Sequence, residues 1–323
     1  NRHLQKIKKL YLLYVIMKVN YNIFFKMIPI VSYIKRNPRS TKRLIGLSYK
    51  QLEQLINKGQ EYHQTKKSEL AKSERRLIKA GGGRKSLLNT EEQIILTLYY
   101  LHNHPTFEIL GIHFNVCEST ANNVFHYWLN ILSDILPSSL LEQVKKNPSD
   151  EKWVKEILTE FELIVDSCEQ DRERPSSSEK QKKYYSCKKK RHTFKNQVIT
   201  TPNGQEIVDV TVGHPGPHSD INLWRQQSKK LDETQKYSGD KAYYGEDRIK
   251  TPKKKPRNKE MPPEIKEDNK KKSRERIFVE HLIRVIKIFR VASDRFRLNS
   301  QNYQKVILTV CGLVRLRIGA LII

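Results

Sequence analysis

The sequence predicts a mixed α/β protein in which an all-α domain precedes a domain built on a mixed sheet. Two patterns carry this prediction. Within residues 41–145, Leu, Ile and Tyr recur every three or four residues, which is the spacing of one helix face. Beyond Asn147 the pattern changes to short apolar segments separated by turn residues, followed by an apolar helix over residues 276–290. We therefore expect the α/β domain to occupy residues 150–323.

Charge is the strongest signal in the composition. The chain has 323 residues, with 61 Lys and Arg against 35 Asp and Glu, so its formal net charge is +26. A hydrophobic content of 37% is enough to form a core, which excludes a wholly disordered basic protein. So large a charge favours a polyanionic partner, either nucleic acid or an anionic membrane surface.

We interpret residues 1–40 as a basic N-terminal extension. Because it opens on Asn1 and not on Met, we consider Met17 the candidate native start. Lys18 and Lys26 interrupt its apolar stretch and leave no uncharged run of membrane-spanning length. The four cysteines of the chain fit neither a zinc knuckle nor a disulfide framework, which favours a reducing, cytoplasmic compartment.

The helical domain is predicted to contain a hinge and three consecutive helices. Three glycines at positions 81–83 cannot hold a helix and indicate the hinge. Thr90 and Gln93 have the spacing of a capping box, which starts a helix that runs to about residue 101. Two further helices, over residues 105–114 and 119–132, are separated by a turn of helix-turn-helix length.

The last of these helices has an apolar face and a polar face. The apolar face consists of Ala121, Val124, Phe125, Trp128 and Leu132. Thr120, Asn123 and Tyr127 lie on the other face, where they could contact DNA bases or phosphates. The alternative, a plain three-helix bundle without DNA contact, has the same spacing.

In the α/β domain, two predicted strands each end at an aspartate. Residues 161–165 form a buried strand ending at Asp166, and residues 235–239 form a short strand ending at Asp240. Between them we expect a hairpin with a tight turn at Asn203-Gly204 and then a helix over residues 220–230.

The apolar helix over residues 276–290 carries a charged stripe. Arg276, Glu280, Arg284 and Lys287 fall within about 80° of one another on the helical wheel. One interpretation pairs Glu280 with Arg276 and Arg284 within the helix. In the other, Glu280 joins Asp166 and Asp240 around metal ions, because clustered carboxylates stay ionised only beside divalent cations. All-oxygen ligands suit Mg²⁺, and two such ions could cleave a phosphodiester.

Two basic runs flank these candidate acids. Residues 248–276 hold 13 basic and 5 acidic residues and predict a Lys-rich mobile loop. Residues 182–195 hold seven basic and no acidic residues. Each run alone is typical of a solvated surface, whereas two runs beside the acids favour a groove that binds a phosphate backbone.

Several ordered motifs resemble the insertion-sequence-five type of DDE transposase, over about residues 40–320. The motifs are Asp166-x2-Glu169 with Arg174-Pro175, residues 185–193, Pro215-Gly216 with Ser219-Asp220, residues 239–243, residues 251–256, and residues 280–287. The chain departs from the family at Ser273, where a tyrosine is usual, at Ser167-Cys168 and at Ala242. None of these departures removes a candidate metal ligand.

The resemblance implies an RNase-H-like catalytic domain behind a helix-turn-helix DNA-binding domain. Asp166, Asp240 and Glu280 would be the catalytic acids and hold two Mg²⁺ ions, for which Mn²⁺ can substitute. The DNA-binding residues would be Arg276, Arg284, Lys287, Lys188, Lys189, Lys190, Arg191, Thr120, Asn123 and Tyr127. Glu169 would be either an outer acid of the centre or a partner of Arg172 or Lys183.

The implied activity is hydrolysis at transposon ends followed by transfer of the freed 3′-hydroxyls to target DNA. The expected partners are double-stranded DNA, as terminal inverted repeats and as target, and a second copy of the chain in a homodimer or higher oligomer. We expect no membrane partner and a place beside the nucleoid. The alternatives are a decayed DNA-binding protein without catalysis and a related plain nuclease.

Overall fold

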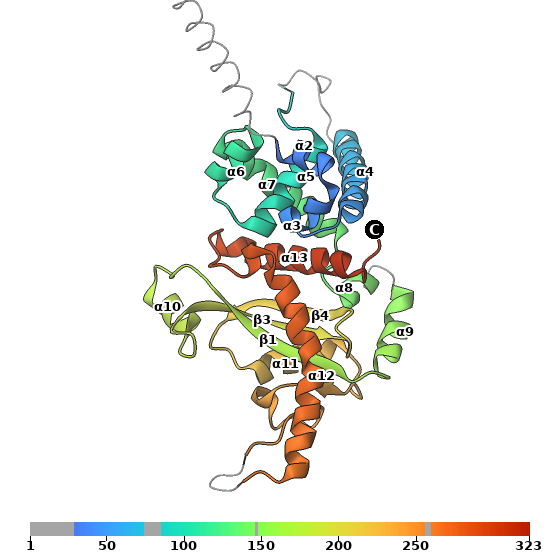
Figure 1. Cartoon of the computed structure of the whole chain (residues 1–323), viewed down its shortest axis with the longest axis vertical. Helices are drawn as coiled ribbons and strands as arrows, with labels where there is room; N and C mark the ends of the chain where they lie inside the picture. Colours follow the sequence, from blue (N-terminus) through green and yellow to red (C-terminus); the bar gives the residue numbers. More distant parts are fainter. Residues whose placement is uncertain (1–28, 74–84, 146–147, 256–259) are drawn as a thin grey trace, which may run out of the picture.

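The computed structural model describes residues 29–73, 85–145, 148–255 and 260–323, which form a helical region and a sheet region packed on each other (Figure 1). The predicted hinge at residues 81–83 and the candidate start Met17 lie outside the described residues. No helix in the described ranges is long and apolar enough to cross a bilayer.

The helical region consists of helices of 5 to 25 residues, most of which share one core, whereas the last of them, at residues 140–144, packs on the sheet region. Its helices are α2 (Ile30–Arg36), α3 (Thr41–Ile45), α4 (Tyr49–Ser73), α5 (Thr90–Asn103), α6 (Phe107–Phe114), α7 (Glu118–Ile135) and α8 (Leu140–Val144). The three helices predicted after the hinge are confirmed as α5, α6 and α7. Val31 and Ile34 of α2 are buried in this core, so the packed region includes residues that the sequence assigned to the N-terminal extension.

The first turn of α5 differs from the prediction by one residue. Asn89, and not Thr90, is the N-cap: its side chain accepts from the Glu92 amide at 2.9 Å, and Glu92 Oε2 accepts from the Asn89 amide at 2.8 Å. Asn caps a helix as well as Thr does, so spacing alone could not choose between them. Gln93 is left to accept from Trp128 Nε1 at 2.6 Å, which ties α5 to α7.

The sheet region contains six strands and five main helices. They are α9 (Pro148–Leu158), β1 (Leu163–Asp171), α10 (Ser178–Tyr184), β2 (Tyr185–Ser186), β3 (Arg191–Thr200), β4 (Ile207–Pro215), α11 (Asp220–Gln227), β5 (Tyr237–Ser238), β6 (Ile249–Lys250), α12 (Pro263–Lys287) and α13 (Tyr303–Ile318). β3 is antiparallel to β1, β2 and β4, whereas β5 is parallel to β1 and β6 is parallel to β5. The predicted mixed sheet is confirmed.

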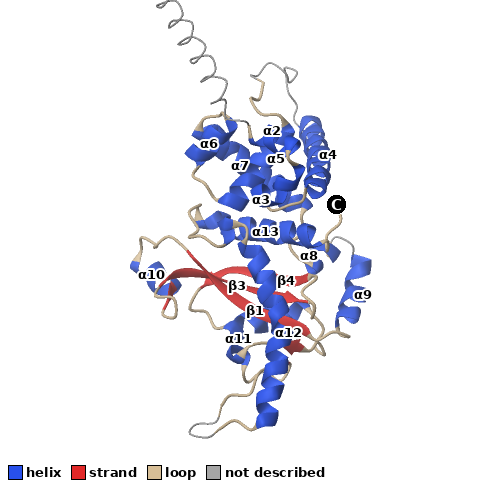
Figure 2. Ribbon diagram, in the orientation of Figure 1, coloured by secondary structure: helices blue, strands red, loops and turns tan. Residues whose placement is uncertain are grey.

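Helices cover both faces of this sheet (Figure 2). Successive side chains of a strand point to opposite faces. Leu163 and Val165 of β1 belong to the apolar cluster that includes α11, whereas Ile164 packs against Val279 and Ile283 of α12. The layer order is therefore α11, sheet, and then α12 with α13, beyond which lies the helical region.

Helix α13 joins the two regions through a buried arginine. The Arg315 side chain is fully buried, and its Nε and Nη2 contact the two carboxylate oxygens of Glu206 at 2.6 and 2.9 Å. Its Nη1 donates to the carbonyl oxygens of Pro137 and Ser139 at 2.9 and 3.1 Å. One guanidinium thus connects α13, the β3–β4 connection and the chain between α7 and α8.

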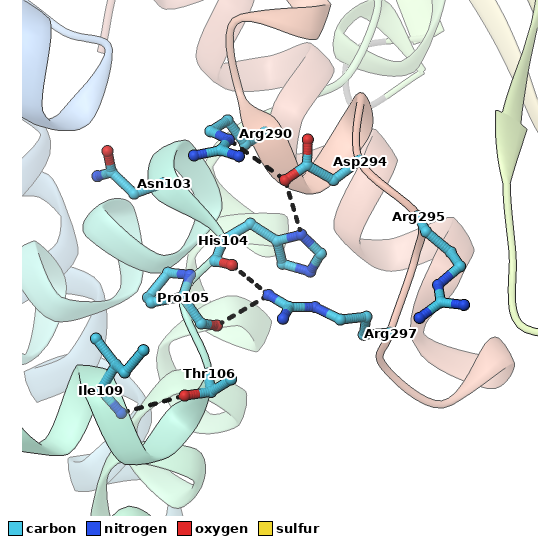
Figure 3. Close-up of a pocket in the computed structure, with 9 residues that line it drawn as sticks. All are labelled: Asn103, His104, Pro105, Thr106, Ile109, Arg290, Asp294, Arg295 and Arg297. Carbon is cyan, nitrogen blue, oxygen red and sulfur yellow. Dashed lines mark hydrogen bonds and ion pairs between the residues drawn. The ribbon is translucent and has the colours of Figure 1, made fainter.

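A second joint links the α5–α6 connection to the segment after α12 (Figure 3). Arg297 donates to the carbonyl oxygens of His104 and Pro105. Asp294 Oδ2 lies 3.3 Å from Arg290 Nε and 3.6 Å from His104 Nδ1, beside a cavity of about 420 Å³. Burial, with the Arg297 charge, lowers the pKa of His104 to about 4, so this histidine is neutral near pH 7.

Two predictions about loops were wrong. Residues 248–276 are not one loop, because α12 begins at Pro263 and includes the lysines that follow it. Ion pairs one turn apart, such as Lys272 with Asp268 at 2.8 Å, support a helix in this charged segment. The hairpin is confirmed, but its turn is not the tight one predicted: Gly204 has a φ of +66°, whereas Asn203 does not have the positive φ that such a turn requires.

Candidate active site

Strand register brings Asp166 and Asp240 to neighbouring positions. In the parallel pair of β1 and β5, Ile164 lies opposite Ser238, and each aspartate follows two residues later. Neighbouring strands lie about 4.8 Å apart, so the two carboxylates leave the sheet side by side. β5 ends before Asp240 as predicted, but β1 does not end at Asp166: it continues to Asp171 because these residues pair with β3.

The backbone on both sides of Asp240 is closely packed or hydrogen-bonded. Asp240 caps a short 3-10 helix over Lys241–Tyr243, and its Oδ1 accepts from the Ala242 amide at 2.8 Å. A Cβ on Gly239 would lie 2.9 Å from the Tyr243 ring and 3.0 Å from Ile249. Only glycine fits before the aspartate, which explains the Gly-Asp pair in the sequence.

Helix α12 brings Glu280 to the same face of the sheet. Val279 and Ile283 pack on Ile164, and Asp166 shares the β1 face of Ile164 because it lies two residues further on. Glu280 lies between these two packing residues, and its side chain is 54% exposed. Arg276 Nη2 lies 3.6 Å from Glu280 Oε1, so the predicted ion pair within the helix is present with Arg276.

The other two acids contribute to the pKa of Asp166. That pKa is raised to about 6, mainly by burial and in smaller part by the carboxylates of Asp240 and Glu280. The Ser167 amide, which donates to Asp166 Oδ1 at 2.8 Å, and the Arg276 guanidinium lower that pKa without cancelling the shift. Arg276 is therefore the cation that faces both Asp166 and Glu280.

The donor set suits a hard divalent cation. It consists of carboxylate oxygens whose repulsion Arg276 relieves only in part, and a bound cation would relieve it further. Within the described residues, no group of three or more His, Cys, Asp or Glu side chains already has metal-binding geometry. The exposed Glu280 side chain is free to change rotamer toward the two aspartates.

A buried lysine, for which sequence reasoning predicted no role of its own, supports the opposite side of β1. Lys195 of β3 is 7% exposed, and its Nζ lies 2.9 Å from Asp220 Oδ1. Ser167 Oγ donates to the same Asp220 oxygen at 2.6 Å. Asp220 thus anchors the residue next to Asp166. A lysine inside a predicted strand was the available signal, but it was counted with the basic run.

Among the described residues, Glu169 forms neither of the ion pairs that were predicted as one alternative, with Arg172 or with Lys183. Its Oε2 accepts from Thr193 Oγ1 at 2.7 Å across the β1–β3 pair. Arg172 lies instead over the rings of Tyr184 and Phe194, at 4.1 and 4.3 Å from their centroids.

The predicted DNA-binding residues of the sheet region lie in two places. Arg284 and Lys287 are exposed on α12 near the acids. Lys188, Lys189 and Lys190 are exposed in the turn between β2 and β3, followed by Arg191, which pairs with Asp171 at 2.6 Å.

The predicted residues of α7 lie in the helical region, beyond α13 from the acids. The apolar face of α7 is buried as predicted, with Val124 only partly so. Asn123 is exposed, whereas Thr120 is half-buried with its Oγ1 3.1 Å from Cys117 Sγ. The Tyr127 hydroxyl lies 2.8 Å from His63 Nδ1 of α4, so it also takes part in helix packing.

Comparison with known proteins agrees with this division of the chain. The family described as DDE superfamily endonuclease matches residues 165–315, and the family described as helix-turn-helix of DDE superfamily endonuclease matches residues 85–138. The first match covers β1 to α13 and the second covers α5 to α7.

A curated relative covers both regions. It is a probable transposase for insertion sequence element IS702 from Microchaete diplosiphon, which is 32% identical over 222 residues, or 67% of this chain and 76% of the relative. No solved structure matches the chain. With both family matches in this order and this relative, the chain belongs to the DDE superfamily of transposases and is an endonuclease of that superfamily.

Proposed function

We propose that this transposase, of the insertion-sequence-five type, binds the terminal inverted repeats of its element, cleaves the strands there and transfers the freed 3′-hydroxyls to target DNA. The observation that carries the catalytic part is the raised pKa of Asp166, which is caused mainly by burial and to which Asp240 and Glu280 add from two other elements. Ionising a desolvated carboxyl group close to other carboxylates is costly, and groups with such raised pKa values are concentrated at functional centres.

Asp166, Asp240 and Glu280 are proposed to hold two divalent ions, Mg²⁺ with Mn²⁺ as a substitute. Such ions, when bound, would supply an activated water and would neutralise negative charge at a phosphodiester. The chain itself places one carboxylate on β1 and one just after β5, and it supplies the third from α12. No covalent protein intermediate is needed, because water and then the DNA 3′-hydroxyl are the nucleophiles.

Basic side chains on α12 would hold the DNA near the acids. Arg284 and Lys287 are exposed on this helix, and Arg276 lies partly buried beside Glu280. Arginine binds phosphate through paired N–H groups, whereas lysine acts as a point charge. We assign Arg276 to the reacting phosphate, and Arg284 and Lys287 to the backbone that leads away from it.

Two further surfaces would contact the DNA duplex outside the acid centre. The turn of Lys188, Lys189, Lys190 and Arg191 carries exposed positive charge that can replace the counterions of the DNA backbone. In the helical region, α7 presents Thr120, Asn123 and Tyr127, and we assign sequence recognition of the repeats to this helix. Two ends must be joined in one event, so we propose a homodimer or higher oligomer on DNA.

Strand transfer with the element's own ends tests this function. Incubated with Mg²⁺ and a duplex that carries the flanking inverted repeats, the chain should nick the end and join it to a target plasmid. Cleavage without joining would favour the plain nuclease. Tight binding of the repeats with no Mg²⁺- or Mn²⁺-dependent cleavage would contradict the enzymatic proposal and favour a DNA-binding protein that has lost catalysis.

A further inference from the structure

A second pocket lies at the end of the sheet remote from Asp166, and the proposed chemistry does not use it. Its volume is about 500 Å³. It is formed where α10, β2 and the start of β3 meet, in the part that extends sideways from the sheet in Figure 1. The lining residues are Arg174, Gln181, Lys182, Tyr185, Cys187 and His192.

The pocket is lined by two cationic side chains that form no ion pair among the described residues. None of its six lining residues is acidic, and neither Arg174 nor Lys182 has an ion-pair partner among the described residues. Arg174 is oriented by Gln181, whose Oε1 accepts from its Nη2 at 2.9 Å. The cavity of Figure 3 is different, because Asp294 there already pairs with Arg290. The α10 pocket therefore offers its cations to an external anion.

The pocket also offers an aromatic ring. Tyr185 is 41% exposed and meets the His192 ring edge to face, with centroids 5.5 Å apart. The neighbouring Tyr184 ring is covered by the Arg172 guanidinium, at 4.1 Å. Burial and the Arg174 and Arg172 charges lower the pKa of His192, so near pH 7 this residue adds a ring without adding charge.

We propose that the α10 pocket binds one unpaired nucleotide of a DNA strand, with its base stacked on Tyr185 and its phosphate held by Arg174 and Lys182. A flat ring attached to an anion matches an aromatic wall beside two cations. A base within a duplex is covered by its neighbours on both sides, so only a base outside the stack can reach Tyr185. This inference rests on the proposed action on DNA.

The position of the pocket suggests how the strand is used. From Asp166, β1 continues to its last residue, Asp171. Asp171 lies opposite Thr193 at the start of β3, close to the pocket. Five residues of strand span about 17 Å, or roughly five nucleotide steps of a DNA strand. The pocket would thus hold a displaced nucleotide away from the reacting phosphate, and it would favour DNA with a locally opened end.

Equilibrium binding by fluorescence anisotropy tests the proposal with the full chain. The probes are a blunt duplex, the same duplex with a short single-stranded overhang, and that overhang made abasic so that phosphates remain without bases. Wild type should bind the normal overhang more tightly than the abasic one. Tyr185→Ala should weaken binding of the normal overhang by about 5- to 150-fold, the range for loss of one stacked base. Tyr185→Phe should restore it.

The controls separate this pocket from the DNA-binding function as a whole. Tyr185→Ala should leave affinity for the blunt and abasic duplexes within about twofold, as should Trp153→Ala, which removes an exposed aromatic side chain on α9. Equal affinity of wild type for normal and abasic overhangs would overturn the pocket assignment while blunt-duplex binding still supported the proposed function. Absence of binding to every duplex would instead contradict the proposed function.

A labelling experiment locates the nucleotide without relying on a variant of Tyr185. Cys187 lines the pocket and is exposed, and in a Cys117→Ser background it is the exposed thiol that remains among the described residues, because Cys168 is half-buried and Cys311 is buried. The normal overhang should protect Cys187 from maleimide, whereas the abasic overhang should not. Equal protection by both DNAs would contradict base binding here. Equal protection by a free deoxynucleoside monophosphate at the same concentration would contradict a DNA strand as the ligand.

Discussion

At the junction between the helical and sheet regions, buried charges have partners, whereas the acid centre gathers carboxylates that repel one another. Arg315 is satisfied by both oxygens of Glu206 and by carbonyl groups. At the centre, burial together with Asp240 and Glu280 raises the pKa of Asp166 to about 6, and Arg276 offsets only part of this shift.

This difference separates charged groups that stabilise the fold from charged groups that destabilise it. Burying an ion pair costs desolvation free energy, which the attraction and hydrogen bonds within the pair offset. Removing one partner leaves the other charge buried without this compensation and is strongly destabilising. Carboxylates that repel one another do not stabilise the fold. They are typical of functional sites, where a bound ligand can neutralise their charge. Breaking a pair should therefore weaken the protein, and neutralising a central acid should strengthen it while ending catalysis.

The largest expected effect is on cleavage by Asp240→Asn. Loss of one metal-binding carboxylate should lower the rate of Mg²⁺-dependent nicking by roughly 10³-fold or more, since each factor of ten is about 1.4 kcal/mol of transition-state stabilisation. Binding of the element's ends should remain, because the basic surfaces are unchanged. Asp247→Asn, at an exposed aspartate nearby, should nick at the wild-type rate. Normal nicking by Asp240→Asn would show that the acid is misassigned.

The next largest effect is on stability, from Arg315→Met. This change leaves the half-buried Glu206 carboxylate without its counter-charge and should lower the free energy of unfolding by up to about 3–5 kcal/mol, the range for a fully buried pair. Urea unfolding measures it. The double variant Arg315→Met/Glu206→Leu should recover much of that loss, because no uncompensated charge remains. A single variant that costs less than about 1 kcal/mol would mean that this joint does not hold the two regions together.

A smaller effect concerns pH at the other joint. His104 has a pKa of about 4 in the fold and about 6.5 when unfolded, so between these values only the unfolded chain binds the proton. Stability should therefore fall as pH drops from 6.5 to 4, by at most about 3 kcal/mol. His104→Asn, which suits the φ of +50°, should flatten this dependence between pH 7 and pH 4.5 in urea unfolding. Parallel profiles would contradict the assignment to His104.

Patterns of local spacing predicted much of the fold. The helices α5, α6 and α7, the hairpin and the short strand before Asp240 follow from periodicity and turn residues, which act within a few positions. The sequence also placed Glu280 on a stripe with Arg276, because helical spacing fixes which side chains share a face.

Contacts between distant segments could not be predicted in the same way. β1 extends past Asp166 because β3 pairs with it, and no local residue marks that pairing. The lysines after Pro263 join a helix through ion pairs, although their composition resembles a loop. Lys195 belongs to a basic run in sequence but is buried against Asp220, a partner that only the fold brings close.

The most direct test is the free energy of unfolding of wild type and Asp166→Asn at pH 7.5, measured in urea across a Mg²⁺ titration. The pKa of Asp166 is raised in the fold, so its ionised form costs stability as pH rises through about 6. Without Mg²⁺, Asp166→Asn should be more stable than wild type by up to about 3 kcal/mol. Added Mg²⁺ should stabilise wild type and leave the variant unchanged. A variant that is less stable than wild type, or that gains equally from Mg²⁺, would contradict the account of the acid centre.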